Sequence, residues 1–322
     1  MAKILVFLEH HGNELQKGAL GVLSKAAQLG GDIAGVVVGE GARAVADEAG
    51  KFGASVVFAA DDPRLAAPLP QPRVDVLAKL VRDEGFETVL FAQSVLAADV
   101  AGALSARLEA GLNWDLVDIV ADGDGFIGKR PALADSVYAD VGWTSTPRLA
   151  LFRSGSFDAN ATGGSAEVRG LEVELEDFST LTELVSQEEE EESTGPSIED
   201  ADVIVAGGRG LGDPEKFALV EDLARALGGA VGATRAVVDA GWYPYASQVG
   251  QTGKSVSPKL YVAVGISGAI QHKVGMQSSN VIVSINKDPN APIFEYSDLG
   301  VVGDLHEIVP KLTELVRSRK GS

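Results

Sequence analysis

Continuous apolar runs, separated by stretches with helical spacing, are the feature that most limits how this chain can fold. The runs at residues 4–8 and 32–38 lack the alternation of a half-exposed strand, so strands formed there must be buried on both faces. Residues 14–29 have helical spacing and stop at a Gly-Gly pair, and the small residues of 42–52 predict a second helix. Buried strands joined by helices predict a parallel sheet covered on both sides.

The first domain continues this alternation and ends at an acidic run. Residues 55–59 and 88–91 predict strands, and 74–82 and 98–109 predict helices; shorter strand-like pieces fill 114–176. Residues 186–197 read SQEEEEESTGPS, which has no apolar period and predicts an extended, solvated linker. A functional acidic patch is the less favoured alternative. We expect an N-terminal α/β domain at 1–185, an acidic linker at 186–200 and a second domain at 201–322.

A second alternating unit follows the acidic run. Residues 203–206, 260–264 and 280–285 predict strands, and 214–227, 270–276 and 305–317 predict helices. This layout fits an open doubly wound sheet, in which ligands bind at the carboxyl ends of the strands. The expected fold class is α/β, with two doubly wound domains.

Composition excludes several functional classes. The net charge of −19 disfavours a nucleic-acid partner, because phosphate contacts need a positive surface. This charge resides entirely in residues 1–200, since 201–322 hold 12 basic and 12 acidic residues. The difference indicates two domains with different roles, although an acidic surface kept for solubility explains it about equally well. No cysteine is present, and the four histidines show no ligand spacing, so we expect no metal. The sequence has no long apolar stretch and no signal-peptide layout, so we expect a cytoplasmic protein that is not membrane-embedded.

Two Gly-rich loops of the second domain could bind an anion. In the loop GGRGLGDP (207–214), glycines permit close backbone approach, Arg209 adds charge, and Asp213 can cap the following helix. A plain tight turn is the alternative. In 264–272, Ser267 and Gly268 at a helix start offer N–H groups to a phosphate, unless the serine is only a cap.

The stretch QVGQTGKS (248–255) ends like a phosphate-binding P-loop but does not match one. Gln248 stands where that motif needs a glycine, and no helix is predicted to start at Lys254. Its amide, hydroxyl and backbone donors instead suit the polar edge of a planar ring. In the nearby block GATRAVVD (232–239), Arg235 can stack on an aromatic face; taken alone, it is more often a salt-bridged surface arginine.

Together these segments closely resemble the C-terminal FAD domain of electron-transfer flavoprotein α subunits. The matching blocks are GGRGLG (207–212), GATRAVVDAGW (232–242), QVGQTGKSVSPKLYVAVGISGAIQHKVGM (248–276) and INKDPNAPIFEYSDLGVVGDL (285–305). The first domain, which starts ILVFLEH, resembles the family's nucleotide-hydrolase-like first domain more loosely.

The resemblance implies an FAD site. Its expected residues are Arg209, Thr234, Arg235, Asp239, Gln248, Val249, Gly250, Gln251, Thr252, Gly253, Ser267, Gly268, Ala269, Ile270, Gln271, His272, Asn286, Asp304 and Leu305.

Within this set, the resemblance implies a role for each group, and the chemistry of the side chains agrees with it. Ser267 and Gly268 should hold the pyrophosphate, and Asn286 and Asp304 the adenosine end. Gln251 and Thr252 can donate toward the N5 side of the flavin. Arg235 over the ring and His272 near N1 and the C2 carbonyl should face the negative charge that reduction adds, and a positive group there favours single-electron transfer.

The resemblance further implies an electron carrier without substrate chemistry of its own. Its expected donors are flavin dehydrogenases of the acyl-CoA dehydrogenase type, as in fatty acid β-oxidation, and its acceptor is a quinone-linked oxidoreductase. Its expected partner is a β subunit that carries AMP. No general base stands beside a nucleophile, and His10, His11 and His306 are expected to be structural or at the surface. The alternatives are a flavin enzyme with its own substrate and a nucleotide-binding sensor.

Overall fold

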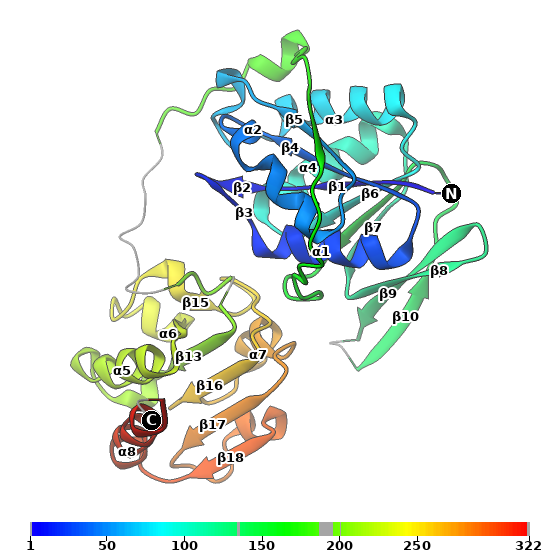
Figure 1. Ribbon diagram of the computed structural model, residues 1–322. Coiled ribbons are helices and arrows are strands. Elements are labelled where there is room, and N and C mark those ends of the chain that lie inside the picture. Colours follow the sequence, from blue (N-terminus) through cyan, green and yellow to red (C-terminus); the bar gives the residue numbers. More distant parts are fainter. Residues whose placement is uncertain (1, 134–135, 187–195, 200, 321–322) are drawn as a thin grey trace. The chain divides into compact units, whose positions relative to one another are not determined.

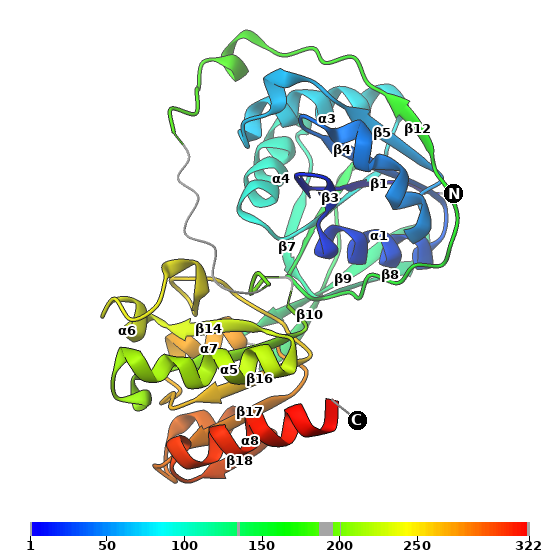
Figure 2. The same cartoon turned by 60° about the vertical axis from the view of Figure 1, so that its left-hand side comes forward.

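The computed structural model describes residues 2–133, 136–186, 196–199 and 201–320. The chain divides into two compact units, Met1–Gln187 and Glu188–Ser322 (Figures 1 and 2). Most of the expected acidic linker, 186–200, lies outside the described residues. Among the helices that the structure describes, none is long and apolar enough to cross a membrane.

The first unit is built on a parallel sheet with the strand order β12-β5-β4-β1-β6-β11-β7. The strands are β1 (Lys3–Phe7), β4 (Asp32–Val38), β5 (Val56–Ala60), β6 (Thr88–Ala92), β7 (Leu112–Leu116), β11 (Arg148–Phe152) and β12 (Glu167–Gly170). An antiparallel sheet, β10-β9-β8, is formed by β8 (Asp118–Asp122), β9 (Gly125–Ala132) and β10 (Val137–Val141). The sequence did not predict this second pairing.

Helices cover both faces of the first sheet, as the buried strand runs predict. On one face α1 (Lys17–Leu29), α2 (Ala42–Val45) and the 3₁₀ helix η1 (Ala46–Phe52) form one apolar cluster with the sheet. On the other face α3 (Pro70–Glu84) and α4 (Val95–Leu108) form a second cluster. Two further 3₁₀ turns, η2 (Pro63–Leu65) and η3 (Asp177–Thr180), lie in connections.

Two expected helices of the first unit differ from the structure. Residues 14–15 belong to a small hairpin, β2 (His10–His11) with β3 (Glu14–Leu15), so α1 begins at Lys17 and not at 14. Leu15 fits the helical spacing, but it lies in a strand of the hairpin, and its buried side chain packs in the apolar cluster beneath α1. The expected helix at 42–52 is α-helical only to Val45 and continues as a 3₁₀ helix.

The second unit has the strand order β15-β14-β13-β16-β17-β18, again parallel throughout. Its strands are β13 (Val203–Gly207), β14 (Ala230–Thr234), β15 (Gln248–Val249), β16 (Leu260–Val264), β17 (Ile282–Asn286) and β18 (Leu299–Val302). Its helices are α5 (Ala218–Leu227), α6 (Arg235–Val238), α7 (Ile270–Met276) and α8 (Leu305–Lys320), with 3₁₀ turns η4 (Arg209–Leu211), η5 (Pro214–Phe217), η6 (Tyr245–Ser247) and η7 (Pro292–Tyr296).

The second sheet is also covered on both faces. Helices α5 and α8 pack on one face, which Figure 2 shows with the two helices side by side. Residues of α7 and η7 pack on the other face. The expected helix at 214–227 starts with a 3₁₀ turn, and Asp213 accepts a hydrogen bond from the backbone N–H of Lys216, which is the predicted cap.

The core of the second unit also includes a residue from before position 201. Ile198, which the sequence assigns to the solvated linker, is only 3% exposed and packs with Ile204, Tyr261 and other buried residues. The neighbouring Glu199 forms an ion pair with Lys254, with 3.1 Å between Oε2 and Nζ. The described residues just before β13 therefore belong to the packed structure. The free energy gained by burying Ile198 exceeds the tendency of the neighbouring polar residues to stay in solvent.

We expect the substitution Ile198→Ala to destabilise the second unit by about 2–4 kcal/mol, since it removes a buried side chain from a packed cluster. Val185→Ala, at a position that is 95% exposed, serves as the control and should change the free energy of unfolding by less than about 0.5 kcal/mol. Urea unfolding curves of both variants measure this. Equal stability of the two variants would show that residue 198 lies outside the cooperative core.

Candidate functional site

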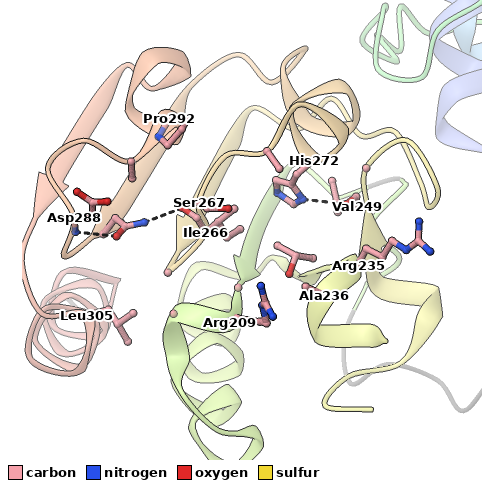
Figure 3. Close-up of a pocket in the computed structure, with 18 of the residues that line it drawn as sticks. Arg209, Arg235, Ala236, Val249, Ile266, Ser267, His272, Asp288, Pro292 and Leu305 are labelled. Carbon is pink, nitrogen blue, oxygen red and sulfur yellow. Dashed lines mark hydrogen bonds between the residues drawn. The ribbon is translucent and has the colours of Figure 1, made fainter. Parts of the chain in front are cut away.

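A cavity of about 820 Å³ opens at the carboxyl edge of the second sheet. Strand β13 comes first and lies in the middle; the chain then builds β14 and β15 on one side and returns to β16 on the other. The loops after β13 and β16 therefore diverge at this point, which is where ligands bind in doubly wound folds. Figure 3 shows the surrounding side chains.

Glycines let the two central loops meet. The N–H of Gly208 donates to the carbonyl of Val264 at 2.9 Å, and that of Gly210 donates to Gly265 at 3.0 Å. A Cβ on Gly208 would lie 2.4 Å from the carbonyl oxygen of Gly265, so a side chain has no space there. Both loops line the cavity, and Arg209 contributes a guanidinium. The loop therefore forms part of the cavity wall in addition to making a tight turn.

The loop after β16 reaches the cavity with Ser267 and then enters α7. Ser267 is not the helix cap, which was the alternative that the sequence left open: Ala269 occupies the N-cap position. The carbonyl of Ser267 accepts a hydrogen bond from Ile293, and Gly268 has φ +89°, with space for a Cβ blocked by the backbone of Ile293. The first helical bonds of α7 run from residues 272 and 273 to Ala269, so the preceding N–H groups have no partner within the helix.

Hydrogen bonds from three sides hold the turn that carries Thr252. Gln248, which is buried, donates from Nε2 to Thr252 Oγ1 at 3.2 Å. The hydroxyl of Tyr245 donates to the carbonyl of Thr252 at 2.9 Å. The N–H of Gln251 donates to the carbonyl of Gln271 at 2.7 Å. No helix begins at Lys254, as expected, so this segment presents Thr252 to the cavity without forming a P-loop.

His272 is a buried, neutral imidazole in this structure. Its Nδ1 lies 3.1 Å from the carbonyl of Val249 and its Nε2 lies 2.9 Å from the hydroxyl of Tyr261. A carbonyl can only accept, so Nδ1 carries the proton and Nε2 accepts from the tyrosine. Burial lowers the pKa of His272 to about 4, and the bond to Val249 offsets this only in part. Desolvation therefore keeps the ring neutral at pH 7 in this geometry. The structure gives His272 no fixed positive charge, and its role beside the ring stays a prediction.

Arg235 lies at the rim of the cavity (Figure 3). Its side chain is 65% exposed and its Nε pairs with Asp239 at 3.2 Å, one helical turn further along the chain. The ion pair agrees with the interpretation of Arg235 as a salt-bridged surface residue. Its position at the rim agrees with the interpretation of Arg235 as a ligand-contacting residue. An exposed pair of this kind contributes little to stability, so folding leaves Arg235 available to a ligand.

The other end of the cavity is polar. Asn286 bridges two loops, because its Nδ2 donates to the carbonyl of Ile266 at 2.9 Å and its Oδ1 accepts from the N–H of Asp288 at 3.0 Å. Asp304 accepts from the N–H of His306 at 2.9 Å at the start of α8. These hydrogen bonds fix the positions of the Asn286 and Asp304 side chains.

Most of the expected site residues meet in this cavity. Those that line it are Arg209, Thr234, Arg235, Asp239, Val249, Gly250, Thr252, Ser267, Ala269, Gln271, His272, Asn286, Asp304 and Leu305. Gln248, Gln251, Gly253, Gly268 and Ile270 are not among the lining residues. Gln248 instead holds Thr252, which does line it; Gly268 lies against the backbone of Ile293, and Ile270 is 68% exposed.

Sequence reasoning missed some lining residues: Ala236, Ile266, Lys287, Asp288, Ala291, Pro292 and His306. His306 was expected to be structural or at the surface, yet it lies beside Asp304 in the cavity wall. The segment from 287 to 292 directly follows β17, so its place after a central strand was an available signal.

Comparisons with known proteins agree over nearly the whole chain. Residues 197–277 match the model of the electron transfer flavoprotein FAD-binding domain, and residues 4–176 match the electron transfer flavoprotein domain. The chain is 39% identical to the electron transfer flavoprotein subunit alpha of Mycobacterium leprae over 322 residues, covering 100% of both chains. It is 37% identical to the subunit of the same name from Bacillus subtilis, covering 97% of this chain and 96% of the relative.

We expect the stability of the second unit to fall as the pH drops from about 6.5 to about 4. In this range the unfolded chain binds a proton on His272 that the folded chain excludes, because the folded pKa is about 4 and the ordinary value is 6.5. Protonation of His272 should lower the free energy of unfolding by about 3 kcal/mol at the acidic end of this range, and above pH 6.5 it should have no effect.

The measurement is urea unfolding at several pH values, followed by Trp242 fluorescence in a Trp114→Phe, Trp143→Phe background, since Trp242 is then the sole tryptophan. His272→Gln cannot titrate and should flatten the curve relative to the parent. Parallel pH profiles for parent and variant would contradict the buried neutral histidine.

Proposed function

Because this chain belongs to the electron transfer flavoprotein family as an α subunit, we propose that the cavity of its second unit holds FAD at the residues described above. The observation that carries this proposal is the coincidence of three features at one switch point: a cavity of about 820 Å³, two loops in backbone contact, and polar side chains at both ends. Ligand pockets span about 300–1,000 Å³, so this volume suits a dinucleotide.

The lining residues divide by chemistry along the cavity. Ser267 and Arg209 are suited to the pyrophosphate, since one stands beside free N–H groups and the other is cationic. Asn286 and Asp304 are suited to the adenosine end, where a carboxylate can accept from ribose hydroxyls. Val249 to Thr252 and Gln271 are suited to the polar edge of the flavin ring. The FAD would supply the site that stores the electrons; the chain supplies position and charge.

In this proposal, Arg235 supplies the positive charge near the flavin ring. His272 is neutral at pH 7, so it offers shape and a hydrogen-bonded contact surface but no fixed positive charge. Arg235 is a permanent cation at the cavity rim. A cation there lowers the energy of a ring that gains negative charge on reduction, and this favours transfer of one electron at a time.

The partners follow from the same proposal. We infer that the chain works as an electron carrier with no substrate of its own, in a heterodimer with a β subunit that carries AMP. Its electrons come from flavin dehydrogenases of the acyl-CoA dehydrogenase type and go to a quinone-linked oxidoreductase. Ile270 and Val274 are exposed one turn apart on α7, next to the cavity, and such apolar side chains support a covering subunit at this place.

The test of the function is co-expression of the chain with a β subunit from the same source. A yellow 1:1 complex with one FAD per α chain is expected, while the α chain alone should retain FAD poorly because part of its binding energy depends on the partner. A colourless complex would contradict the proposal and favour the nucleotide-sensor alternative. Turnover of a small-molecule substrate without any acceptor protein would favour the flavin-enzyme alternative.

We expect Arg235→Ala in that complex to lower the first one-electron potential of the flavin by about 40–90 mV. One charge at a half-exposed position is worth about 1–2 kcal/mol, and 59 mV corresponds to a tenfold change in a one-electron equilibrium. Spectroelectrochemical titration measures this, and Arg235→Lys should recover part of the loss because charge returns without the planar group.

The matched control is Arg225→Ala. Arg225 is also exposed and paired with an aspartate three residues away, but it does not line the cavity. Its removal should leave the potential within about 10 mV of the parent, well below the 59 mV of a tenfold change. Equal shifts for the Arg225 and Arg235 variants would mean that only overall charge matters.

A further inference from the structure

Residues 249–252, here called the edge segment, line one end of the large cavity with little regular structure of their own. Strand β15 supplies only two residues and stands at the edge of its sheet. Residues 250–259, all of which the structure describes, belong to no helix or strand. Such a segment keeps a fixed position only where other elements hold it, so the contacts behind the edge segment decide the shape of this end of the cavity.

Helix α7 lies along the backbone of this segment and of the residues that follow it. The N–H of Gln251 donates to the carbonyl of Gln271 at 2.7 Å, and the N–H of Val256 donates to the carbonyl of Gly275 at 2.8 Å. Gln271 is near the start of α7 and Gly275 is near its end. The two hydrogen bonds therefore tie the whole length of the helix to the segment.

Two glycines permit this close approach. A Cβ on Gly275 would lie less than 3 Å from the backbone nitrogen and Cα of Gly250. Gly250 has φ +138°, and a Cβ there would lie 2.8 Å from the carbonyl oxygen of Gln271. Both glycines are buried. Glycine inside a helix is less favourable than alanine, and the contact with Gly250 accounts for a glycine at position 275.

Helix α7 has no freedom to move outward and make room for a side chain. Met276, next to Gly275, is fully buried and packs in one apolar cluster with Val249 and Val256. Moving the helix away would expose Met276 and open a gap in that cluster. An added Cβ at position 275 must therefore displace the backbone of the edge segment instead.

A chain of two hydrogen bonds holds the start of the edge segment from the sheet. Nδ1 of His272 donates to the carbonyl of Val249 at 3.1 Å, which Figure 3 marks, and Nε2 accepts from the hydroxyl of Tyr261 at 2.9 Å. Tyr261 is fully buried in β16 and is not among the residues that line the cavity. Its hydroxyl fixes the imidazole, and the imidazole in turn fixes the Val249 carbonyl.

We propose that Gly275 and Tyr261 are positioning residues for the flavin ring: neither lines the cavity, yet together they fix the edge segment against which the ring lies. This inference rests on the proposed FAD site and adds two residues outside it. The opposite end of the cavity is held separately, because Ser267 accepts from the N–H of Ile293 and Asn286 donates to the carbonyl of Ile266. Changes behind the edge segment should therefore affect the ring and spare the adenosine and pyrophosphate groups.

The test is rebinding of FAD to the FAD-depleted α–β complex, measured by ultrafiltration, with ADP as the competitor for the same site. ADP carries the adenosine and the two phosphates without the ring, so its inhibition constant reports only that end. In Gly275→Ala we expect FAD to bind about tenfold more weakly, because binding must then reorder the edge segment. The inhibition constant of ADP should stay within about twofold of the parent value, since its contacts lie at the other end.

Tyr261→Phe tests the same proposal without adding volume. It removes one hydroxyl and leaves Nε2 of His272 without its donor, so FAD should bind about fivefold more weakly, again with ADP within about twofold of the parent. If Gly275→Ala gives no folded complex by circular dichroism, this variant decides the proposal alone.

The matched control is Gly102→Ala. Gly102 is also inside a helix, α4, but a Cβ there meets no atom within 4 Å, so both constants should stay within about twofold of the parent. Equal losses for FAD and ADP in the two test variants would show a general structural role and overturn the proposal, and so would unchanged FAD binding in both. A parent complex that fails to rebind FAD would contradict the proposed function itself, and it is recognised before any variant is measured.

Discussion

The second unit depends on a backbone contact between two loops that leaves no space for a side chain. Where the sheet reverses its winding, the loop after β13 touches the loop after β16 through the hydrogen bonds of Gly208 and Gly210. A Cβ on either glycine would lie less than 3 Å from the backbone of Gly265. This contact brings two strand ends together, sets the floor of the cavity and leaves N–H groups near the place where a ligand's phosphates can lie. A larger residue would separate the loops and so remove the floor.

Burial decides which groups in that cavity carry charge. His272 and Tyr261 are both desolvated. Their mutual hydrogen bond and the bond to the Val249 carbonyl give each ring nitrogen of the neutral imidazole a partner, so no second ring proton is needed. Burial raises the pKa of Tyr261, so the pair as a whole is neutral. Charge remains with groups at the rim such as Arg235, where water and Asp239 surround it. The cavity thus combines a neutral inner wall with a charged edge, and electrostatic effects on a bound ring should come from the edge.

Sequence patterns predicted the parallel strands well, because a strand buried on both faces leaves a continuous apolar run. The strand at 260–264 and the helix at 270–276 have their predicted bounds. Patterns failed where tertiary contacts competed. Leu15 satisfies a helical period but lies in a hairpin strand and packs in the core, and Ile198 is buried although glutamates precede it. The neutrality of His272 could not be foreseen, since it depends on a tyrosine 11 residues away and a carbonyl 23 residues away. The approach of His306 to the cavity likewise depends on where α8 begins.

The two units show how one winding can serve two chemistries. In both, the first strand is central and the cavity opens where the chain crosses to the other half of the sheet. In the second unit that strand ends in Gly207 and Gly208, which expose backbone and give a long, open site. In the first unit it is followed by Leu8, which is buried in the core, and by Glu9, and the cavity there is smaller and has a carboxylate in its wall. Backbone N–H groups favour anions, and a buried carboxylate rejects them. The residues that directly follow the central strand, more than the fold itself, therefore determine the charge of ligand that each unit can accept.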